Sequence, residues 1–523
     1  MTNYIDLIEL SNKKETTSTI ERIDRIIFGL LLVVIGFIPL IVLGSMQQVQ
    51  SPVISYISQM QSARLGDLFG YYKVMALIIV TSIIAILFFV KVIFYNAPIR
   101  KTFFNWIIGA AIIVILLTTI LSPAATIALT GHYTRVEGAL TWLCYILLFF
   151  FALNIRYPEN TFRYVLWTLV PFVFINFYII TRHFYGNPIF QTDLIRDIVT
   201  STISGGSVSK NADIVGTLNQ WNNMSGMFAI MTVLFVGAAI FDRDTSRSAI
   251  YYVVGLFSVA VLLMSISTTG FLAILMIFGL LLLYAFRYGF LKRAAIIIGT
   301  FLLLMLPILH VLSTENPSVF RESLGFFIKD NPYVESIPTQ TSTSSTTSEV
   351  VQEDSSISSV LTSEGEYSLP VLPERGNTAL SSRIYIWDKT FEILKERPVF
   401  GYGMDTFMYY FPHYNIDARA GIWDEHPVVG KAHSLYFGLM QGVGYVGFIP
   451  FLALFVSVLA ITLMTFIRKP SETFSLYILF GIAFITYLIQ GIVNDSMPGI
   501  SAPLIVIAGI AMAHLLPKET EQS

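Results

Sequence analysis

Charged residues are scarce in this chain. Asp, Glu, Lys and Arg make up 13% of its 523 residues, and hydrophobic residues make up 54%. Soluble domains carry about a quarter charged residues. This scarcity, with a mean hydropathy of +0.69, excludes an ordinary soluble protein and predicts an integral protein of a lipid bilayer. The net charge of −2 gives no reason to expect nucleic acid as a partner.

Cysteine is almost absent. The single Cys144 lies in an apolar run, so a disulfide within the chain and a cysteine-based metal site are both excluded. The polar segment around Arg383 has no paired acidic motif of the DxD kind, so no metal ion and no other cofactor is expected. A small-residue cleavage site is also missing after the first apolar run, Ile26–Leu43, which predicts an uncleaved first span.

Long apolar runs are abundant. A spanning helix needs about 20 apolar residues. Runs of this kind predict about twelve membrane helices, near residues 26–44, 73–94, 103–122, 139–155, 164–182, 224–241, 249–267, 270–286, 294–313, 434–467, 472–493 and 500–516. The run at 434–467 is too long for one span. Its glycines Gly442, Gly444 and Gly447 predict a break into a short re-entrant or tilted piece and a true span.

Basic residues predict the orientation of the helices. Every second short loop is basic, which is typical of cytoplasmic loops, so both termini are expected inside. These loops contain Arg100, Lys101, Arg156, Arg163, Arg243, Arg247, Arg287, Lys292, Arg293, Arg468 and Lys469. The predicted fold class is an all-α polytopic membrane protein. Its parts are a cytoplasmic tail (1–25), nine spans (26–313), a large extracytoplasmic loop (314–433), three spans (434–516) and a second tail (517–523).

The large loop contains two kinds of sequence. Residues 339–365 are rich in Ser and Thr and predict a disordered insert. Residues 383–397 predict a short amphipathic helix, since apolar side chains recur every three or four positions. The predicted apolar stripe is formed by Ile384, Trp387, Phe391 and Leu394. Ser381 or Ser382 can cap this helix and Pro398 ends it, so its first turn presents Arg383 on the outer face. For such a pattern alone, a surface helix with a solvated arginine is the commoner interpretation.

The order of several short motifs resembles the O-antigen ligase and polysaccharide polymerase superfamily. The motifs are Arg383 with Trp387, then Pro398, Gly401, Gly403 and Phe407, then His433 with Ser434, then Gly442, Gly444 and Gly447. Two earlier outer segments, TGHYTRVEGALTWLCY and GTLNQWNNMSG, are similar to members from Gram-positive bacteria; they contain Arg135, Glu137, Gly138, Gly216, Asn219 and Asn222. The implied fold is GT-C-like.

The resemblance implies a membrane glycosyltransferase of the bacterial plasma membrane, active on the extracytoplasmic face. Its donor would be a glycan on undecaprenyl diphosphate and its acceptor a sugar hydroxyl, with inversion and without a metal. Guanidinium groups suit a departing diphosphate, so Arg383 and Arg135 are the candidates for that role. His433 is the candidate general base, because histidine titrates near pH ~6.5.

Further candidates are weaker. Family members commonly carry an arginine where this chain has Thr269, so its phosphate-binding role is either absent here or moves elsewhere, with Arg182 and Lys431 as the candidates. Trp387 could stack on glycan or anchor at the interface. His426 is a second candidate base at the acceptor side. Asp495 could bind acceptor sugar or simply end its helix in solvent.

Alternatives remain open at this point. A lipid-linked polysaccharide flippase would need ionisable residues inside several spans, whereas these spans hold chiefly Lys91 and His310. A peptidoglycan polymerase of the shape-and-division type would depend on an acidic outer-loop residue instead of these Arg-Trp and His motifs. Polymerase and ligase are not separable, although the Gram-positive resemblance favours capsule or exopolysaccharide synthesis. A chain-length regulator is a further candidate partner.

Overall fold

The computed structural model describes residues 2–49, 63–203, 216–218, 220–328, 330–334, 383–413, 429–467 and 476–517. Nearly all regular structure in these ranges is helical, and a single two-stranded sheet accompanies it. His426, the helix-capping serines and the Ser/Thr-rich insert lie outside the described residues. So do Asn219 and the basic residues Arg468 and Lys469.

In the part of the chain that the structure describes, nine helices are long and apolar enough to cross a membrane. They are α1 (Thr2–Gly36, whose apolar stretch continues to Leu40), α2 (Tyr71–Tyr95), α6 (Thr161–Phe184), α8 (Trp221–Phe241), α9 (Thr245–Met264), α10 (Thr268–Arg287), α11 (Leu291–Glu315), α16 (Leu435–Ile467) and α18 (Pro498–Leu515). Three shorter apolar helices join them: α3 (Phe104–Ile120), α5 (Ala139–Leu153) and α17 (Ile478–Gln490). Within the described ranges, each of the twelve predicted runs therefore contains a helix, and the all-α polytopic class is confirmed.

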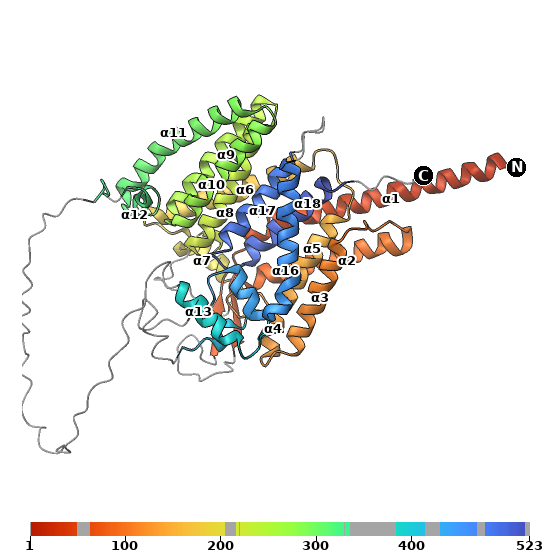
Figure 1. The fold of residues 1–523 in the computed structure, drawn as a ribbon, viewed down its shortest axis with the longest axis horizontal. Coiled ribbons are helices and arrows are strands. Elements are labelled where there is room, and N and C mark those ends of the chain that lie inside the picture. The colour runs from red at the N-terminus through yellow and green to blue at the C-terminus, as the bar shows by residue number, and fades with distance from the viewer. Residues whose placement is uncertain are drawn as a thin grey trace, which may run out of the picture.

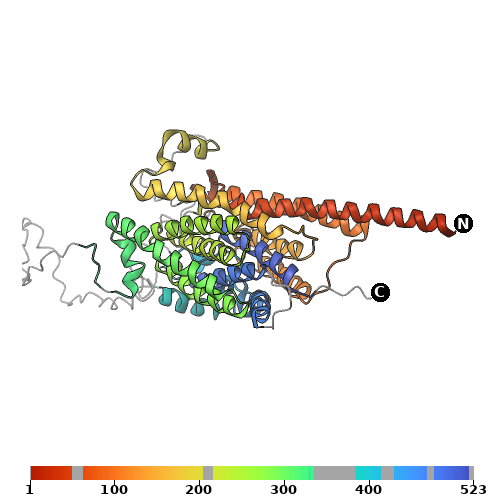
Figure 2. The same cartoon turned by 90° about the horizontal axis from the view of Figure 1, so that it is seen from above.

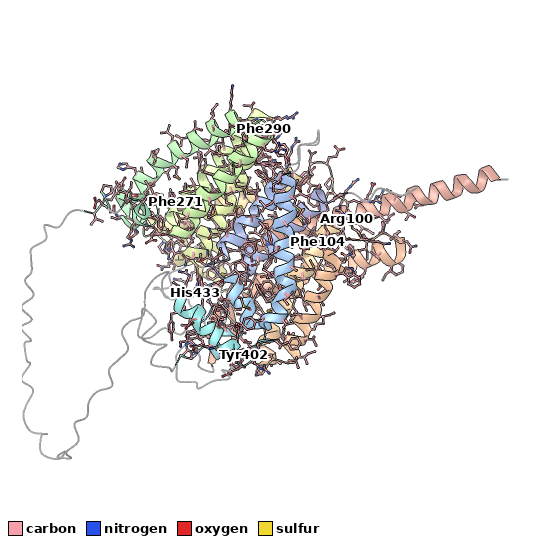
Figure 3. All side chains as sticks on the ribbon, in the orientation of Figure 1. Arg100, Phe104, Phe271, Phe290, Tyr402 and His433 are labelled. Atoms are coloured by element: carbon pink, nitrogen blue, oxygen red, sulfur yellow. The ribbon has the colours of Figure 1, made fainter. Side chains whose placement is uncertain are left out.

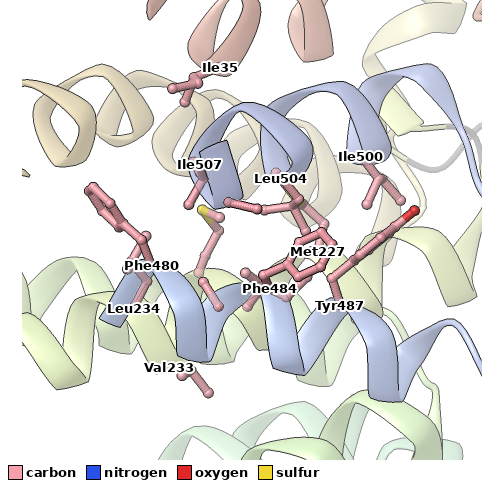
Figure 4. Close-up of a cluster of buried hydrophobic side chains, with 14 of the residues drawn as sticks. Ile35, Met227, Val233, Leu234, Phe480, Phe484, Tyr487, Ile500, Leu504 and Ile507 are labelled. Carbon is pink, nitrogen blue, oxygen red and sulfur yellow. The ribbon is translucent and has the colours of Figure 1, made fainter. Parts of the chain in front are cut away.

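The centre of the bundle is formed by α8, α17 and α18. The apolar stretch of α8 is buried along its whole length, and α8 packs against α9, α10 and α17. Figure 4 shows Met227 and Leu234 beside Phe480, Phe484 and Leu504 in this core. A helix that is apolar on every side is stable only where other helices or lipid surround it.

The first span begins and ends earlier than predicted. Helix α1 starts at Thr2 and ends at Gly36, and a short 3-10 helix η1 (Ile38–Leu40) follows it. The polar part of α1 projects beyond the rest of the bundle (Figures 1 and 2). The chain then forms a hairpin that the sequence did not predict, in which β1 (Ser45–Val49) pairs antiparallel with β2 (Ala63–Asp67).

Helix α16 is interrupted as its glycines predict. Gly444 has φ 74° and ψ 177°, which only glycine adopts without strain, and it separates residues 435–443 from 445–467. The exposed backbone groups pair with the turn after Pro398: Gly403 donates its N–H to the Gly442 carbonyl, and Tyr445 donates to the Pro398 carbonyl. The break in the helix and the glycine-rich turn are therefore one structural unit.

The remaining short elements are connections between the long helices. They are α4 (Ala125–Thr130), η3 (Ile189–Gln191), α7 (Asp193–Thr200), η4 (Gly216–Leu218), α12 (Ser318–Arg321), η5 (Leu324–Phe326), α13 (Arg383–Leu394) and α14 (Phe407–Tyr410). Helices α4 and α13 lie at one end of the bundle (Figure 1). His433 and Tyr402 are at this end, and Phe290 is at the opposite end (Figure 3).

Helix α13 exists where the sequence predicts it, but its buried face is different. Ile386, Thr390 and Leu394 are buried, whereas Ile384 is 49% exposed. The helix packs Ile386 with Phe407 and Phe411, while Trp387 stacks on Phe437 of α16. Phe391 of the predicted stripe is also exposed, because helical spacing defines a stripe but does not say which side meets the rest of the protein.

Candidate functional site

Arg135 is held by a carboxylate from a distant part of the chain. Its Nη2 lies 2.5 Å from Asp405 Oδ1, and both side chains are almost fully buried. The other oxygen of Asp405 accepts hydrogen bonds from the backbone N–H groups of His132 (2.7 Å) and Glu137 (3.2 Å). Asp405 thus connects the segment that follows the glycine-rich turn to the loop between α4 and α5.

Asp495 gathers a second group of charges. Its Oδ2 lies 3.4 Å from Lys431 Nζ and 3.6 Å from His433 Nδ1. Lys431 Nζ also donates to Gln220 Oε1 at 2.8 Å, which links this group to the start of α8. Burial on its own would raise the pKa of Asp495, but the positive charges of Lys431 and Arg135, with the hydrogen bond from Lys431, outweigh it and lower that pKa. Asp495 is therefore an ionised counter-charge inside the site.

His433 is a neutral imidazole at physiological pH. Burial lowers its pKa to about 4; Asp495 opposes this shift, and the nearby cations Lys431 and Arg383 add to it. Its side chain is 38% exposed, so solvent reaches the ring. A neutral ring can accept a proton, and an anion bound beside it would raise its proton affinity.

Arg383 approaches the same group from helix α13. Its Nε donates to the Val493 carbonyl at 3.1 Å. Burial lowers the pKa of Arg383, and the charge of Asp495 opposes the shift. One turn further along, Trp387 Nε1 donates to the Ala432 carbonyl at 2.9 Å, and so holds the backbone next to His433. The first two turns of α13 therefore contact the segments that carry both Asp495 and His433.

Left-handed backbone conformations are concentrated in these loops. In the described residues, five non-glycine residues have a positive φ, and three of them are on these loops: Val136 (57°), Asp405 (59°) and His433 (51°). Such a conformation costs on the order of 1 kcal/mol or more per residue, and it persists where surrounding contacts impose it. Three of these conformations on the loops of a single site indicate that side-chain placement there has been favoured over local stability.

The charged group lines two adjoining pockets that share Arg135 and Lys431. One is buried and also contains Glu137, Asp405, Gln441 and Asp495. The other contains His132, Gln220 and His433. In the described residues, Arg135 Nε and Gln441 Oε1 are buried without a hydrogen-bond partner. An unpaired guanidinium nitrogen at a pocket wall is suited to an anionic ligand.

The structure brings most of the predicted residues together, but not all. Arg135, Arg383, Lys431, His433 and Asp495 converge, and Trp387 adjoins them. Arg182 does not: it is exposed at the end of α6 and has no contact with this group in the described part of the chain. Where relatives carry arginine, Thr269 contacts Ser267 (3.1 Å) instead.

Two residues of the site were not among the sequence-based candidates. Asp405 follows the glycine-rich turn in GYGMDTF, and Glu137 stands in the TRVEGAL segment. An acidic residue within a few positions of the candidate arginine was a usable signal for Glu137. Nothing local marks Asp405, because its partner is far away in sequence. Within the described residues, no three His, Cys, Asp or Glu side chains converge as metal ligands.

Comparison with known protein families finds one match. Residues 253–452 match the family model described as O-antigen ligase. Comparison with curated proteins gives no match. The matched segment runs from α9 into α16 and includes Arg383, Lys431 and His433, whereas Arg135 and Asp495 reach the site from outside it. This match supports a multi-pass membrane protein that ligates or polymerises glycan. The chain therefore carries an O-antigen ligase domain over residues 253–452, which confirms the resemblance that its motifs show.

Proposed function

We propose that the protein is an inverting membrane glycosyltransferase that moves glycan from undecaprenyl diphosphate to a sugar hydroxyl. The observation that carries the proposal is the convergence of Arg135, Arg383 and Lys431 with a neutral, partly exposed His433 at one end of a membrane bundle. Cations at the end of a membrane bundle suit a phosphate group that is attached to a lipid. The neutral imidazole beside them suits the deprotonation of an acceptor hydroxyl.

The reaction uses each group once. Arg135, Arg383 and Lys431 hold the diphosphate through charge-assisted hydrogen bonds. The acceptor oxygen attacks the anomeric carbon from the face opposite the diphosphate, and His433 takes the hydroxyl proton. The bond between the anomeric carbon and the diphosphate oxygen breaks, and the lipid diphosphate leaves as an anion with its electron pair. Three cations stabilise that anion, which is the role a divalent metal would otherwise have.

Asp495 supports the base in this scheme. Its carboxylate lies beside His433 Nδ1 and would stabilise the imidazolium that forms during the reaction. This role replaces sugar binding as our interpretation of Asp495, since its oxygen is already shared by Lys431 and His433. Trp387 presents one face to Phe437 and its N–H to Ala432, so we assign it to positioning of the His433 segment. His426 stays a predicted acceptor-side residue.

Two observations weigh against a flippase. The buried Lys91 of α2 is paired with Asp24 of α1 (2.5 Å), and His310 of α11 contacts Tyr333 (2.8 Å). Both contacts satisfy the ionisable groups locally, and neither adjoins the pockets of the site. We therefore place the transport alternative second. Capsule or exopolysaccharide polymerisation is our choice of product class, with a chain-length regulator as the candidate partner.

Glycan formation in isolated membranes tests the proposal. Membranes with the full-length protein receive a lipid-diphosphate-linked repeat unit, and wild type is compared with Arg383→Ala and His433→Ala at matched expression. We expect transfer to fall at least about a hundredfold in both variants, because each removes a group used in the transition state. Arg196→Ala, on exposed helix α7, is the matched arginine control and keeps wild-type activity. Full activity of both site variants would contradict the proposal.

A further inference from the structure

Glu137 is a buried carboxyl group that the proposed reaction does not use. It is 4% exposed and lines the buried pocket together with Arg135 and Lys431. Its Oε1 accepts a hydrogen bond from the Tyr145 hydroxyl (2.8 Å), and its Oε2 accepts one from Ser496 Oγ (2.6 Å). In the described part of the chain, no lysine or arginine forms an ion pair with it. Both oxygens of this carboxyl group therefore accept hydrogen bonds from neutral hydroxyl groups.

Every element packed around Glu137 presents titratable or charged groups to it. They are Arg135 and His132 on its own loop, Tyr145 on α5, Asp405 before α14, Lys431 before α16, Tyr487 on α17 and Asp495 before α18. Burial raises the pKa of Glu137 to about 7, and the charge of Asp405 adds to that shift. The hydrogen bonds from Ser496 and Tyr145 and the charge of Arg135 oppose it. Near neutral pH the protonated and the ionised forms of this carboxyl group are therefore close in free energy.

The pocket beside Glu137 has unused capacity for an anion. Arg135 is about nine-tenths buried, and its Nε has no partner in the described residues. Its ion pair with Asp405 occupies Nη2. An anion bound to Arg135 and Lys431 would bring negative charge next to the Glu137 carboxyl. Like charges in a buried site favour the protonated form of a carboxyl group.

We propose that Glu137 takes up one proton when the pocket binds a lipid diphosphate, so that donor binding and product release are both linked to its protonation. Glu137 then regulates the affinity of the pocket for the anion. It is distinct from His433, the base that removes the proton from the acceptor hydroxyl. The inference rests on the proposed function only for the class of ligand, a diphosphate on an isoprenoid chain.

Because proton uptake at Glu137 is coupled to anion binding, the affinity for the lipid diphosphate depends on pH. Below about pH 7 the free carboxyl is already protonated, so Glu137 adds no pH dependence to binding. Above that pH, and up to the higher pKa of the complex, binding must take up a proton, and affinity falls about tenfold per pH unit. Alkaline conditions therefore favour release of the lipid diphosphate.

Calorimetry of the full-length protein in detergent tests this inference. Farnesyl diphosphate is the probe, and titrations run from about pH 6 to about pH 9 in buffers of different ionisation enthalpy. We expect wild type to take up close to one proton more than Glu137→Gln at the alkaline end. Its affinity should fall about tenfold more than that of the variant over one pH unit. The probe's own ionisation is the same in both titrations and cancels in the comparison.

Two further variants make the result specific. Glu159→Gln changes an exposed glutamate away from the pocket and keeps the wild-type pH dependence. Ser496→Ala removes a donor that favours the charged carboxylate, so proton uptake should begin at a higher pH; this shift decides the question if Glu137→Gln does not fold.

Equal pH dependence in wild type and Glu137→Gln overturns the inference, as does absence of saturable binding to wild type. Proton-linked binding without glycan transfer leaves the inference standing and overturns the proposed function. If glycan transfer occurs but binding takes up no proton at Glu137, the proposed function stands and the inference about Glu137 is overturned.

Discussion

At the residue scale, two aspartates organise the cations of the site. Asp405 binds Arg135 in a fully buried pair and also accepts two backbone hydrogen bonds. Asp495 binds Lys431 and faces His433. Because charges inside a protein are strongly disfavoured without a partner, each aspartate determines where its cation can be. Substitution of Asp405 should therefore have a different measurable effect from substitution of Asp495.

Removal of the Asp405 charge should destabilise the fold. Asp405→Asn leaves Arg135 buried without its counter-ion, and breaking a buried pair in this way costs about 3–5 kcal/mol. We expect a lower Tm in thermal unfolding of the detergent-solubilised protein. Asp193→Asn is the control, since Asp193 also pairs with an arginine (2.8 Å) but is 88% exposed. An exposed pair contributes about 1 kcal/mol or less. Equal Tm values for the two variants would contradict the structural role of Asp405.

Removal of the Asp495 charge should slow transfer more than it weakens binding. Asp495→Asn loses the group that stabilises a protonated His433, a species formed only as the reaction proceeds. We expect kcat to fall by about tenfold to a hundredfold, with a smaller change in the KM for the acceptor. Steady-state kinetics at varied acceptor concentration distinguish this role from the sugar-binding role that the sequence also allowed. A rise in KM with unchanged kcat would restore that role.

At the element scale, the break in helix α16 explains why glycines recur both at this break and in the turn at 398–403. Gly444 interrupts the helix, and the turn at 398–403 pairs with the exposed backbone. A Cβ atom at Gly444 would lie 2.5 Å from the Val399 backbone, too close for any side chain. Asp405 follows the turn at 398–403 directly in the sequence. The break in α16 therefore sets the position of Asp405, which is on another segment.

Gly444→Ala tests this coupling. The substitution strains a positive φ and forces Val399 away, for about 1–3 kcal/mol of stability, and should displace Asp405 and Arg135. We expect a lower Tm together with loss of glycan transfer. Gly279→Ala on α10 is the control, since its added Cβ meets no atom within 4 Å and alanine favours a helix. Wild-type transfer by Gly444→Ala would show that the break does not position the site.

At the scale of the whole molecule, the site lies at one end of the bundle and the basic loops that the structure describes belong to the other. Charge asymmetry between loops predicts that the site faces the extracytoplasmic side. This prediction places the chemistry where a lipid-linked glycan meets its acceptor.

Cysteine labelling in intact cells measures this orientation. Asp193→Cys, near the site end, should react with a membrane-impermeant maleimide, whereas Glu159→Cys should react only after permeabilisation. Both positions are exposed, and the native Cys144 is buried, so the wild type serves as the unlabelled control. The reverse pattern would place the site in the cytoplasm.

Much of the fold was predictable because it depends on local properties. The length of an apolar run relative to the bilayer determines whether a helix can span it, and a run of glycines shows where a helix can break. The hairpin at 45–67 and the buried face of α13 were not predictable. Strand pairing and helix orientation depend on which surfaces meet, and neither leaves a clear local pattern in 523 residues of mostly apolar sequence.

The sequence by itself determined that this is a membrane protein of about twelve helices, and its motifs made Arg135, Arg383 and His433 candidate site residues. Only the tertiary structure decided that Lys431 joins them and Arg182 does not, that Asp405 and Asp495 are their counter-ions, and that Glu137 lies buried at the same pocket. The physical reason is that span and turn propensities act over a few neighbouring residues. The partner and the pKa of a buried charge are set by segments that folding brings together from distant parts of the chain.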